Sequence, residues 1–469
     1  MRTLIIRSLW TIAVFSMITS CKKESFITSP SANLNITADT IKFDTVFTSI
    51  GSVTKSFKII NENNQKILLS HIKLMGSAPS AYHININGVA TNELTDITID
   101  PNDSIYVFVA VTIDPNLNTN PFIISDSIEI SFNGNNRLVQ LESFGKNAHF
   151  IRDQVITDNV SWTNDLPYVI LGNLQIDTTA TLFIDAGCKI YLHANAAILV
   201  DGTLQAIGAK NNEVQFNGDR LDEPYCNLSG AWPGIYFRNE SKNNQLIFAI
   251  IKNATRAISV ENPSINSNPK LLIKQSIIDN AFETGIESLN SSIDADNTLI
   301  SNCGNNIKIA LGGDYAFTNC TIVAYSTSYL LHAEPVLQVS NYSMQNGAIT
   351  TTNINALFTN CIFWGDGGTV DNELSVIKEG ANVFNVQLQH CLFKNLADPP
   401  NTILTAVISN QDPLFNSVDI ENNYFDFRTT NNLSSPVIDQ GVNTSFLFDL
   451  NNNTRQVGLS TDIGCYENP

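Results

Sequence analysis

The sequence predicts an all-β protein, with a small β-sandwich at residues 38–147 followed by a parallel β-helix at 148–469. Two observations carry this prediction. Short runs of alternating apolar and polar residues dominate the first segment, as in half-buried strands. A residue pattern recurs at intervals of 22 to 41 residues in the second segment, in short β-branched runs without a helical stripe.

The N-terminus predicts an exported, lipid-anchored protein. The first 21 residues carry Arg2 and Arg7 and then an apolar run through Ile18, which is too short for a membrane span and fits an export signal. The ending Ile-Thr-Ser-Cys resembles the lipobox of bacterial lipoproteins, and that resemblance implies lipidation of Cys21. We therefore expect a signal peptide at 1–21 and a location in the cell envelope, on the outer membrane, with the membrane side left open. An ordinary signal peptide with a chance cysteine is the alternative.

Residues 22–37 are polar and lack periodicity, so they are predicted to form a flexible tether. From residue 38 to 147, runs such as KILLSHIKL and DSIYVFVAVTI are separated by clusters of Asn, Gly, Pro and Asp, the pattern of a small sandwich. Their order resembles the Ig-like modules of bacterial envelope proteins, which implies a spacer or an adhesion platform.

The β-helix prediction comes from a repeated sequence, FTNCTI at 317–322 and FTNCIF at 358–363. Alignment around these copies gives a column of small residues: Ala249, Ser276, Thr298, Cys320, Cys361 and Cys391. The residue two places after each member is large and apolar, and the residue three places before it is mostly so. The spacings of 27, 22, 22, 41 and 30 residues indicate a stacked array.

A 22-residue coil with three short strands suits a parallel β-helix, in which like residues stack on like residues about 4.8 Å apart. The residue before the small column is often Asn, which fits a left-handed bend where amides form a ladder. The cysteines are then packing residues, because no CxxC pair occurs and stacked side chains have poor disulfide geometry. The longest gap is one coil with an inserted loop or two coils.

The remainder of this segment resembles a known family. Residues 181–216, with AWPGIYF at 231–237, resemble the opening coils of right-handed β-helix proteins of the pectate-lyase-like superfamily. SPVIDQG at 435–441 and DIGCYE at 462–467 resemble the closing segment of exported β-helix lipoproteins. This resemblance implies a right-handed coil and a closing segment that caps an open sheet end, with Asp439, Arg455 and Asp462 structural.

Composition and motifs limit the chemistry. A net charge of −18 argues against nucleic acid, which requires clustered cations. Enzymes of the resembled fold mostly cleave acidic polysaccharides, yet the Asp-Asp, His-Gly and Arg-Ile-Lys strings of its galacturonan hydrolases are absent. Lyases need Ca²⁺ or cations around the uronate, and Arg is sparse here. Four isolated histidines are predicted to be surface or core fillers without partners, namely His71, His83, His149 and His193, while His390 is predicted to be a bend residue.

Two loops contain candidate ligand-binding residues. The loop at 217–232 combines acids, a cation and aromatic side chains that could hold a sugar or a Ca²⁺ ion, namely Asp219, Arg220, Asp222, Glu223, Tyr225 and Trp232. The alternative is a solvated loop whose Trp covers the edge of the core. A second loop offers Trp364 and Asp366.

The functional hypothesis is a non-catalytic envelope lipoprotein whose β-helix binds glycan or serves as surface structure. The alternative is a polysaccharide lyase or glycoside hydrolase that acts on an acidic polysaccharide. The expected partners are a membrane, through the lipid, and a polysaccharide or envelope glycan. No metal-binding residues are predicted, although the loop at 217–232 could hold a Ca²⁺ ion.

Overall fold

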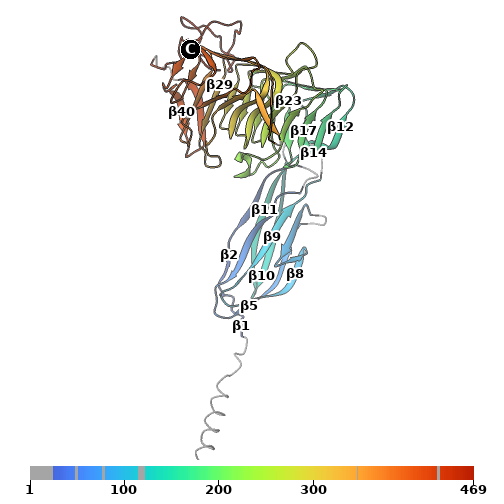
Figure 1. The fold of residues 1–469 in the computed structure, drawn as a ribbon. Helices are drawn as coiled ribbons and strands as arrows, with labels where there is room; N and C mark the ends of the chain where they lie inside the picture. The colour runs from blue at the N-terminus through green and yellow to red at the C-terminus, as the bar shows by residue number, and fades with distance from the viewer. Residues whose placement is uncertain are drawn as a thin grey trace, which may run out of the picture. The chain divides into compact units, whose positions relative to one another are not determined.

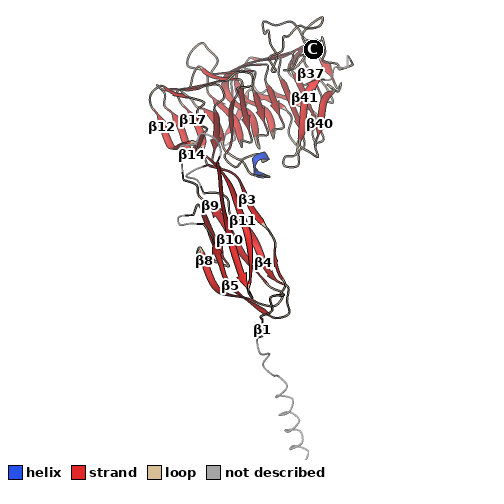
Figure 2. Cartoon of the chain, turned by 180° about the vertical axis from the view of Figure 1, so that it is seen from behind, coloured by secondary structure: helices blue, strands red, loops and turns tan. Residues whose placement is uncertain are grey.

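The structure is a computed structural model that describes residues 25–47, 51–76, 80–114, 122–345, 347–429 and 434–468. The predicted signal peptide and lipidation at Cys21 lie outside these ranges. In the described part, no helix has the length and apolar character needed to cross a membrane. The chain forms two compact units, Met1–Asn147 and Ala148–Pro469 (Figure 1). The all-β fold class is confirmed, since a short 3₁₀ turn at Tyr225–Asn227 is the one helical element among the described residues (Figure 2).

The first unit is a sandwich of two sheets around one hydrophobic core. One sheet contains β1 (Phe26–Ile27), β3 (Thr40–Phe47), β5 (Lys66–Leu74), β8 (Glu93–Ile99), β10 (Phe122–Phe132) and β11 (Asn135–Lys146). The other contains β2 (Leu34–Ile36), β4 (Lys55–Asn61), β6 (Tyr82–Ile86), β7 (Val89–Ala90) and β9 (Ser104–Val111). Every second residue of β9 is buried, as the alternating pattern predicted.

The predicted tether needs correction, because two short strands within residues 25–37 belong to the sandwich. β1 pairs with β5, and β2 pairs with β4. The side chains of Asn33 and Asn35 also donate hydrogen bonds to Glu62, at 2.7 and 2.9 Å. Strands of two and three residues are too short to show a period in the sequence, so pairing with distant strands decides their conformation.

The second unit is a parallel β-helix whose coils follow one another in sequence order (Figure 1). Three columns of parallel strands form its faces. The first column, which follows the small-residue positions, contains β16 (Lys189–Leu192), β19 (Val214–Gly218), β22 (Ala249–Lys252), β25 (Ile277–Asp279), β27 (Leu299–Ser301), β29 (Thr321–Tyr325), β34 (Ile362–Asp366), β37 (Leu392–Phe393) and β39 (Ile408–Ser409).

The second column contains β17 (Ala197–Val200), β20 (Gly234–Phe237), β23 (Arg256–Glu261), β30 (Leu337–Ser340) and β35 (Leu374–Ile377). The third contains β13 (Val160–Trp162), β15 (Thr181–Ile184), β18 (Thr203–Ile207), β21 (Asn244–Ile247), β24 (Leu271–Lys274), β33 (Ile354–Thr359), β36 (Phe384–Gln389) and β38 (Thr402–Thr405). Four long strands bend between faces and belong to two columns: β12 (His149–Ile156), β14 (Tyr168–Ile176), β26 (Thr284–Asp296) and β28 (Asn305–Thr318).

The register confirms the alignment around FTNC. Phe317 pairs directly with Phe358, and Ile322 pairs with Phe363. The longest gap is therefore one coil, and it carries an inserted hairpin of β31 (Tyr342–Gln345) and β32 (Ala348–Thr351). All members of the small column are buried. Burial raises the pKa of the Cys361 thiol well above its usual value, as expected for a packing residue.

The bend position before the small column is left-handed in every copy, with φ between 45° and 53° for Phe248, Gln275, Asn297, Asn319, Asn360 and His390. The predicted amide ladder is present, since the Asn360 side chain donates to Asn319 Oδ1 at 2.9 Å. His390 is confirmed as a bend residue.

The closing segment at 434–468 differs from the prediction that it caps a sheet end. It lies along the row of bends and contacts different coils, through Val442 at Asn360 and through Arg455 at Asn297. Its apolar residues, including Val437 and Ile463, cover outward-facing side chains of the first column in a second hydrophobic core. It therefore ties coils together along the side of the β-helix. The hairpin of β40 (Phe415–Asp419) and β41 (Tyr424–Thr429) contributes Phe427 to the same core.

Candidate functional site

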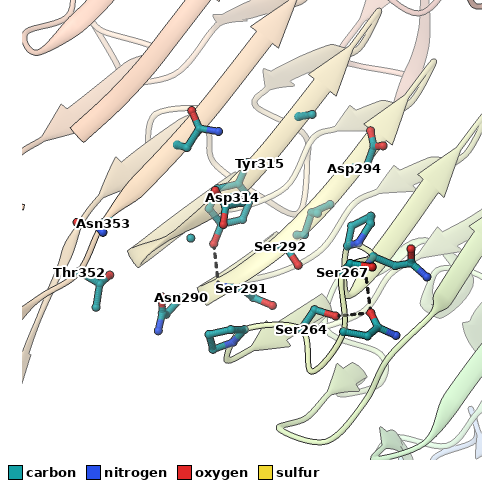
Figure 3. Close-up of a pocket in the computed structure, with 18 residues that line it drawn as sticks. Ser264, Ser267, Asn290, Ser291, Ser292, Asp294, Asp314, Tyr315, Thr352 and Asn353 are labelled. Atoms are coloured by element: carbon teal, nitrogen blue, oxygen red, sulfur yellow. Dashed lines mark hydrogen bonds between the residues drawn. The ribbon is translucent and has the colours of Figure 1, made fainter. Parts of the chain in front are cut away.

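A groove of about 710 Å³ on the β-helix crosses four successive coils where the second column turns into the third. In the two middle coils, β26 and β28 pass through this turn as continuous strands. In the two outer coils, a loop at 262–270 and the β31–β32 hairpin are inserted at the same place. The groove is thus the gap between two inserted loops, above two coils that lack one (Figure 3).

A buried tyrosine holds the floor of the groove in place. The Tyr315 hydroxyl donates to Gly312 O at 2.9 Å, accepts from Ser291 N at 3.2 Å and lies 2.9 Å from Ser288 Oγ. Gly313 has φ +118°, and a Cβ there would overlap the Ser291 carbonyl. A side chain at this position would therefore separate the two coils.

The wall at 262–270 is an ordered loop. Asn266 Oδ1 accepts from Ser264 Oγ and from Asn268 N, at 3.1 and 3.0 Å. At its end, the ammonium of the fully buried Lys270 donates to the carbonyl oxygens of Asn239 and Glu261, at 2.9 and 2.6 Å. Desolvation by burial lowers the pKa of Lys270 to about 8. Such anchoring gives the groove a preformed wall.

Two carboxylates face the groove from neighbouring strands. Ser292 pairs with Asp314 and Asp294 pairs with Ala316, so Asp294 and Asp314 lie on the same outward face, staggered by two positions (Figure 3). Strand spacing and rise place their Cα atoms roughly 8 Å apart. Burial raises the pKa of Asp294 above its usual value. Asp314 is exposed, and neither carboxylate has a hydrogen-bond partner among the described residues.

The other described residues that line the groove are neutral. Most are Asn, Ser, Thr, Pro or Gly, and no Lys, Arg or His is among them. Lys274, outside the lining, lies 3.6 Å from Asp296, farther along β26, and its charge partly opposes the rise in the pKa of Asp294. The groove therefore offers hydroxyl, amide and carboxylate groups without a positive charge.

In the predicted loop at 217–232, most of the candidate polar groups contact one another or neighbouring side chains, and Asn217, Cys226 and Asn227 line a pocket of about 210 Å³. Arg220 donates two hydrogen bonds to the Asp222 carboxylate, at 2.7 and 2.9 Å. Its guanidinium lies 3.8 Å from the Tyr225 ring centroid. Asp219 lies 2.7 Å from His193 Nδ1, and Glu223 accepts from Asn227.

Trp232 cannot serve as a sugar platform. Its side chain is fully buried in the core, and Nε1 donates to Lys252 O at 2.8 Å. Trp232 therefore agrees with the alternative prediction for this loop, in which the tryptophan covers the core. Trp364 is also buried, packed with Tyr325 and Val437 beneath the closing segment. Asp366 accepts from Gly367 N and lies 3.3 Å from Lys394, and these contacts lower its pKa.

The histidine predictions also need correction. Three of the histidines have carboxylate partners on neighbouring coils or strands, in the pairs His71–Glu129, His149–Asp165 and His193–Asp219. A fourth pair was not predicted, because its members are 41 residues apart: His332 Nε2 lies 3.0 Å from Glu373 Oε1, and both side chains are buried. This pair has no opening to solvent and holds two loops together.

In the described part of the chain, no group of three or more His, Cys, Asp or Glu side chains is placed to hold a metal ion. Ca²⁺ stays a prediction. The groove itself was missed because its parts come from four coils spread over residues 263–355, and only the stacking register brings them together.

No protein-family model matches the chain, and no curated protein matches it. Among solved structures, a family 87 α-1,3-glucanase from Streptomyces thermodiastaticus has 8% identity and a TM-score of 0.19, over 76% of this chain and 89% of that one. A family 123 glycoside hydrolase from Clostridium perfringens has 10% identity and a TM-score of 0.19, over 26% of this chain and 30% of the hydrolase. A PapD-like domain of human CEP192 has 11% identity and a TM-score of 0.20, over 28% of this chain and 97% of that domain. Likenesses with such TM-scores carry no argument about this chain.

Proposed function

We propose that the β-helix binds a carbohydrate chain in the groove between the 262–270 loop and the β31–β32 hairpin. The observation that carries the proposal is the lining of this groove, which consists mainly of hydroxyl and amide side chains. Such groups both donate and accept hydrogen bonds, and a sugar presents the same mixture of donors and acceptors.

The preformed walls also support the proposal. Tyr315 pins the floor and Lys270 anchors one wall, so little ordering is needed on binding. The groove spans four coils, or roughly 15 Å at about 4.8 Å per coil step, which is long enough for several sugar units.

The test compares side chains inside and outside the groove. Asn353 and Asn355 are exposed and line the groove, whereas Asp185 is exposed on another coil. Binding of the full-length protein in detergent is measured by calorimetry against polysaccharides first selected on a glycan array. We expect Asn353→Ala with Asn355→Ala to weaken binding at least tenfold and Asp185→Asn to leave it unchanged. Equal affinity of the groove variant and the parent protein would place the site elsewhere.

Hydrolysis is a second candidate function, favoured by Asp294 and Asp314. The Cα atoms of these residues lie roughly 8 Å apart, a separation that allows their carboxyl groups the spacing of about 6.5–9.5 Å found in inverting glycosidases, in which one acid is protonated. Asp294, with its raised pKa, would protonate the leaving oxygen, and Asp314 would activate the attacking water. Release of reducing ends that is lost in both Asp294→Asn and Asp314→Asn would support hydrolysis. Release that survives both changes would exclude these residues.

We also propose that the protein is exported and lipid-anchored through Cys21, so that the groove faces a compartment rich in glycans. The N-terminal sequence supports this. Mass spectrometry of the purified protein should find an acylated Cys21 as its first residue, and Cys21→Ser should release the protein from membranes. An unmodified chain that still begins at Met1 would contradict the proposal.

A further inference from the structure

The charge around the groove limits which carbohydrate fits it. The groove has two carboxylates, Asp294 and Asp314, and no cationic side chain among its described lining residues. A uronic acid unit placed there would bring a third negative charge close to these two, while Lys274, the cation that acts on Asp294, is paired with Asp296 and does not line the groove. The acidic polysaccharides implied by the family resemblance are therefore unfavourable ligands.

An amide row continues the groove along the third column. Asn355 lines the groove, and its Oδ1 accepts from Asn385 on the next coil at 2.7 Å. Gln387 in turn donates to Asn385 at 2.8 Å, and Gln389 donates to Gln387 at 3.3 Å. Each amide keeps further donor and acceptor positions, because an amide group has two N–H groups and a carbonyl with two lone pairs. This row is uncharged. Its step from Asn355 to Asn385 follows the direction in which the coils stack, whereas Gln387 and Gln389 lie farther along the same strand, β36.

We propose that the ligand is an uncharged polysaccharide that runs along the β-helix axis through the groove and continues from Asn355 onto Asn385 of the next coil. This inference rests on the proposed carbohydrate binding and adds the charge and direction of the chain. The hydroxyl groups of an uncharged sugar can donate to both carboxylates, whereas the carboxylate of a uronate cannot donate and adds repulsion there.

The charge is tested with polysaccharide pairs that share a backbone: methyl-esterified and de-esterified homogalacturonan, and hydroxyethyl and carboxymethyl cellulose. The full-length protein in detergent should bind the uncharged member on the order of tenfold more tightly at low ionic strength. This ratio should fall toward one in the Asp294→Asn, Asp314→Asn double variant, and also in high salt. Tighter binding of the charged members would overturn the inference while leaving carbohydrate binding intact. Binding of none of these polymers, or of any glycan on the array, would overturn the proposed function itself.

The direction is tested by chain length. Asn385→Ala should weaken binding of the long uncharged polymer several-fold, but should not change the affinity for oligosaccharides that fill only the groove. Weakening of both to the same extent would indicate general damage or a different path, and no effect on the polymer would exclude the amide row. Circular dichroism melting of the variant distinguishes damage to the fold from loss of contacts.

Discussion

At the scale of single residues, burial of charged groups is the main way in which this β-helix departs from a simple apolar core. Asp296 lies on β26, two positions after the groove residue Asp294, and its side chain is 4% exposed. Desolvation by burial raises the pKa of Asp296 to about 6, against the opposing effect of Lys274. Its Oδ2 lies 3.6 Å from Lys274 Nζ and accepts no hydrogen bond in the described structure. The ionised form of Asp296 is therefore costly in the folded state.

This cost predicts a pH dependence of stability. The pKa of Asp296 is higher in the folded protein than its unfolded value of 3.8, so the folded state binds more protons between these values. The free energy of unfolding should therefore fall as pH rises from about 4 to 6. Asp296→Asn cannot titrate and should be more stable than the parent protein by roughly 2–3 kcal/mol at pH 7, with little advantage at pH 4.

Denaturant unfolding of both proteins at a series of pH values checks this prediction. Asp462, whose pKa is also raised to about 6 by burial, titrates in the same range. The free energy of unfolding of the Asp296→Asn protein should therefore still fall somewhat as pH rises. Adding Asp462→Asn should reduce this remaining fall. A constant difference between Asp296→Asn and the parent protein at all pH values would contradict the assignment.

At the scale of elements, the bends between strands determine how the coils stack. Asn360 combines two roles, because its backbone has φ 53° and its side chain bonds both Asn319 and the Val442 main chain. The recurrence of small and large residues predicted these bends from the sequence, since each coil repeats the same local requirement. The inserted loops have no such recurrence, which is why neither the groove nor the early strands β1 and β2 could be predicted.

Two substitutions separate the roles of Asn360. Asn360→Gly keeps the left-handed backbone accessible but removes the amide, whereas Asn360→Ala removes both. We expect both to destabilise the protein, Asn360→Gly by about 1–3 kcal/mol for the lost buried hydrogen bonds, and Asn360→Ala by about 1 kcal/mol more. Equal stabilities of the two variants in denaturant titrations would mean that the backbone conformation contributes nothing.

At the scale of the whole β-helix unit, the closing segment joins coils that are distant in sequence. Arg455 is buried and donates to Asn297 Oδ1 at 2.8 Å and to Gly464 O at 2.9 Å, and it lies 3.4 Å from Glu467. Sequence resemblance indicated a structural role for Arg455 but placed the segment at a sheet end. Its position along the bends became visible only from contacts between residues more than a hundred positions apart.

Removal of this arginine should therefore loosen the whole side of the β-helix. Arg455→Met leaves Glu467 buried without its charged partner, and we expect a loss of about 3–5 kcal/mol. The double variant Arg455→Met, Glu467→Gln should recover part of this loss, because no unpaired charge remains. Urea denaturation measures both, and a double variant less stable than the single one would contradict this explanation.

The measurement that most directly tests the proposed site is hydrogen–deuterium exchange of the full-length protein with and without a saturating uncharged polysaccharide. We predict added protection at residues 262–270, 290–294 and 352–355, with smaller changes at 384–388. Protection confined to the loop at 217–232, or spread over other parts of the β-helix without these segments, would contradict a binding site in the groove.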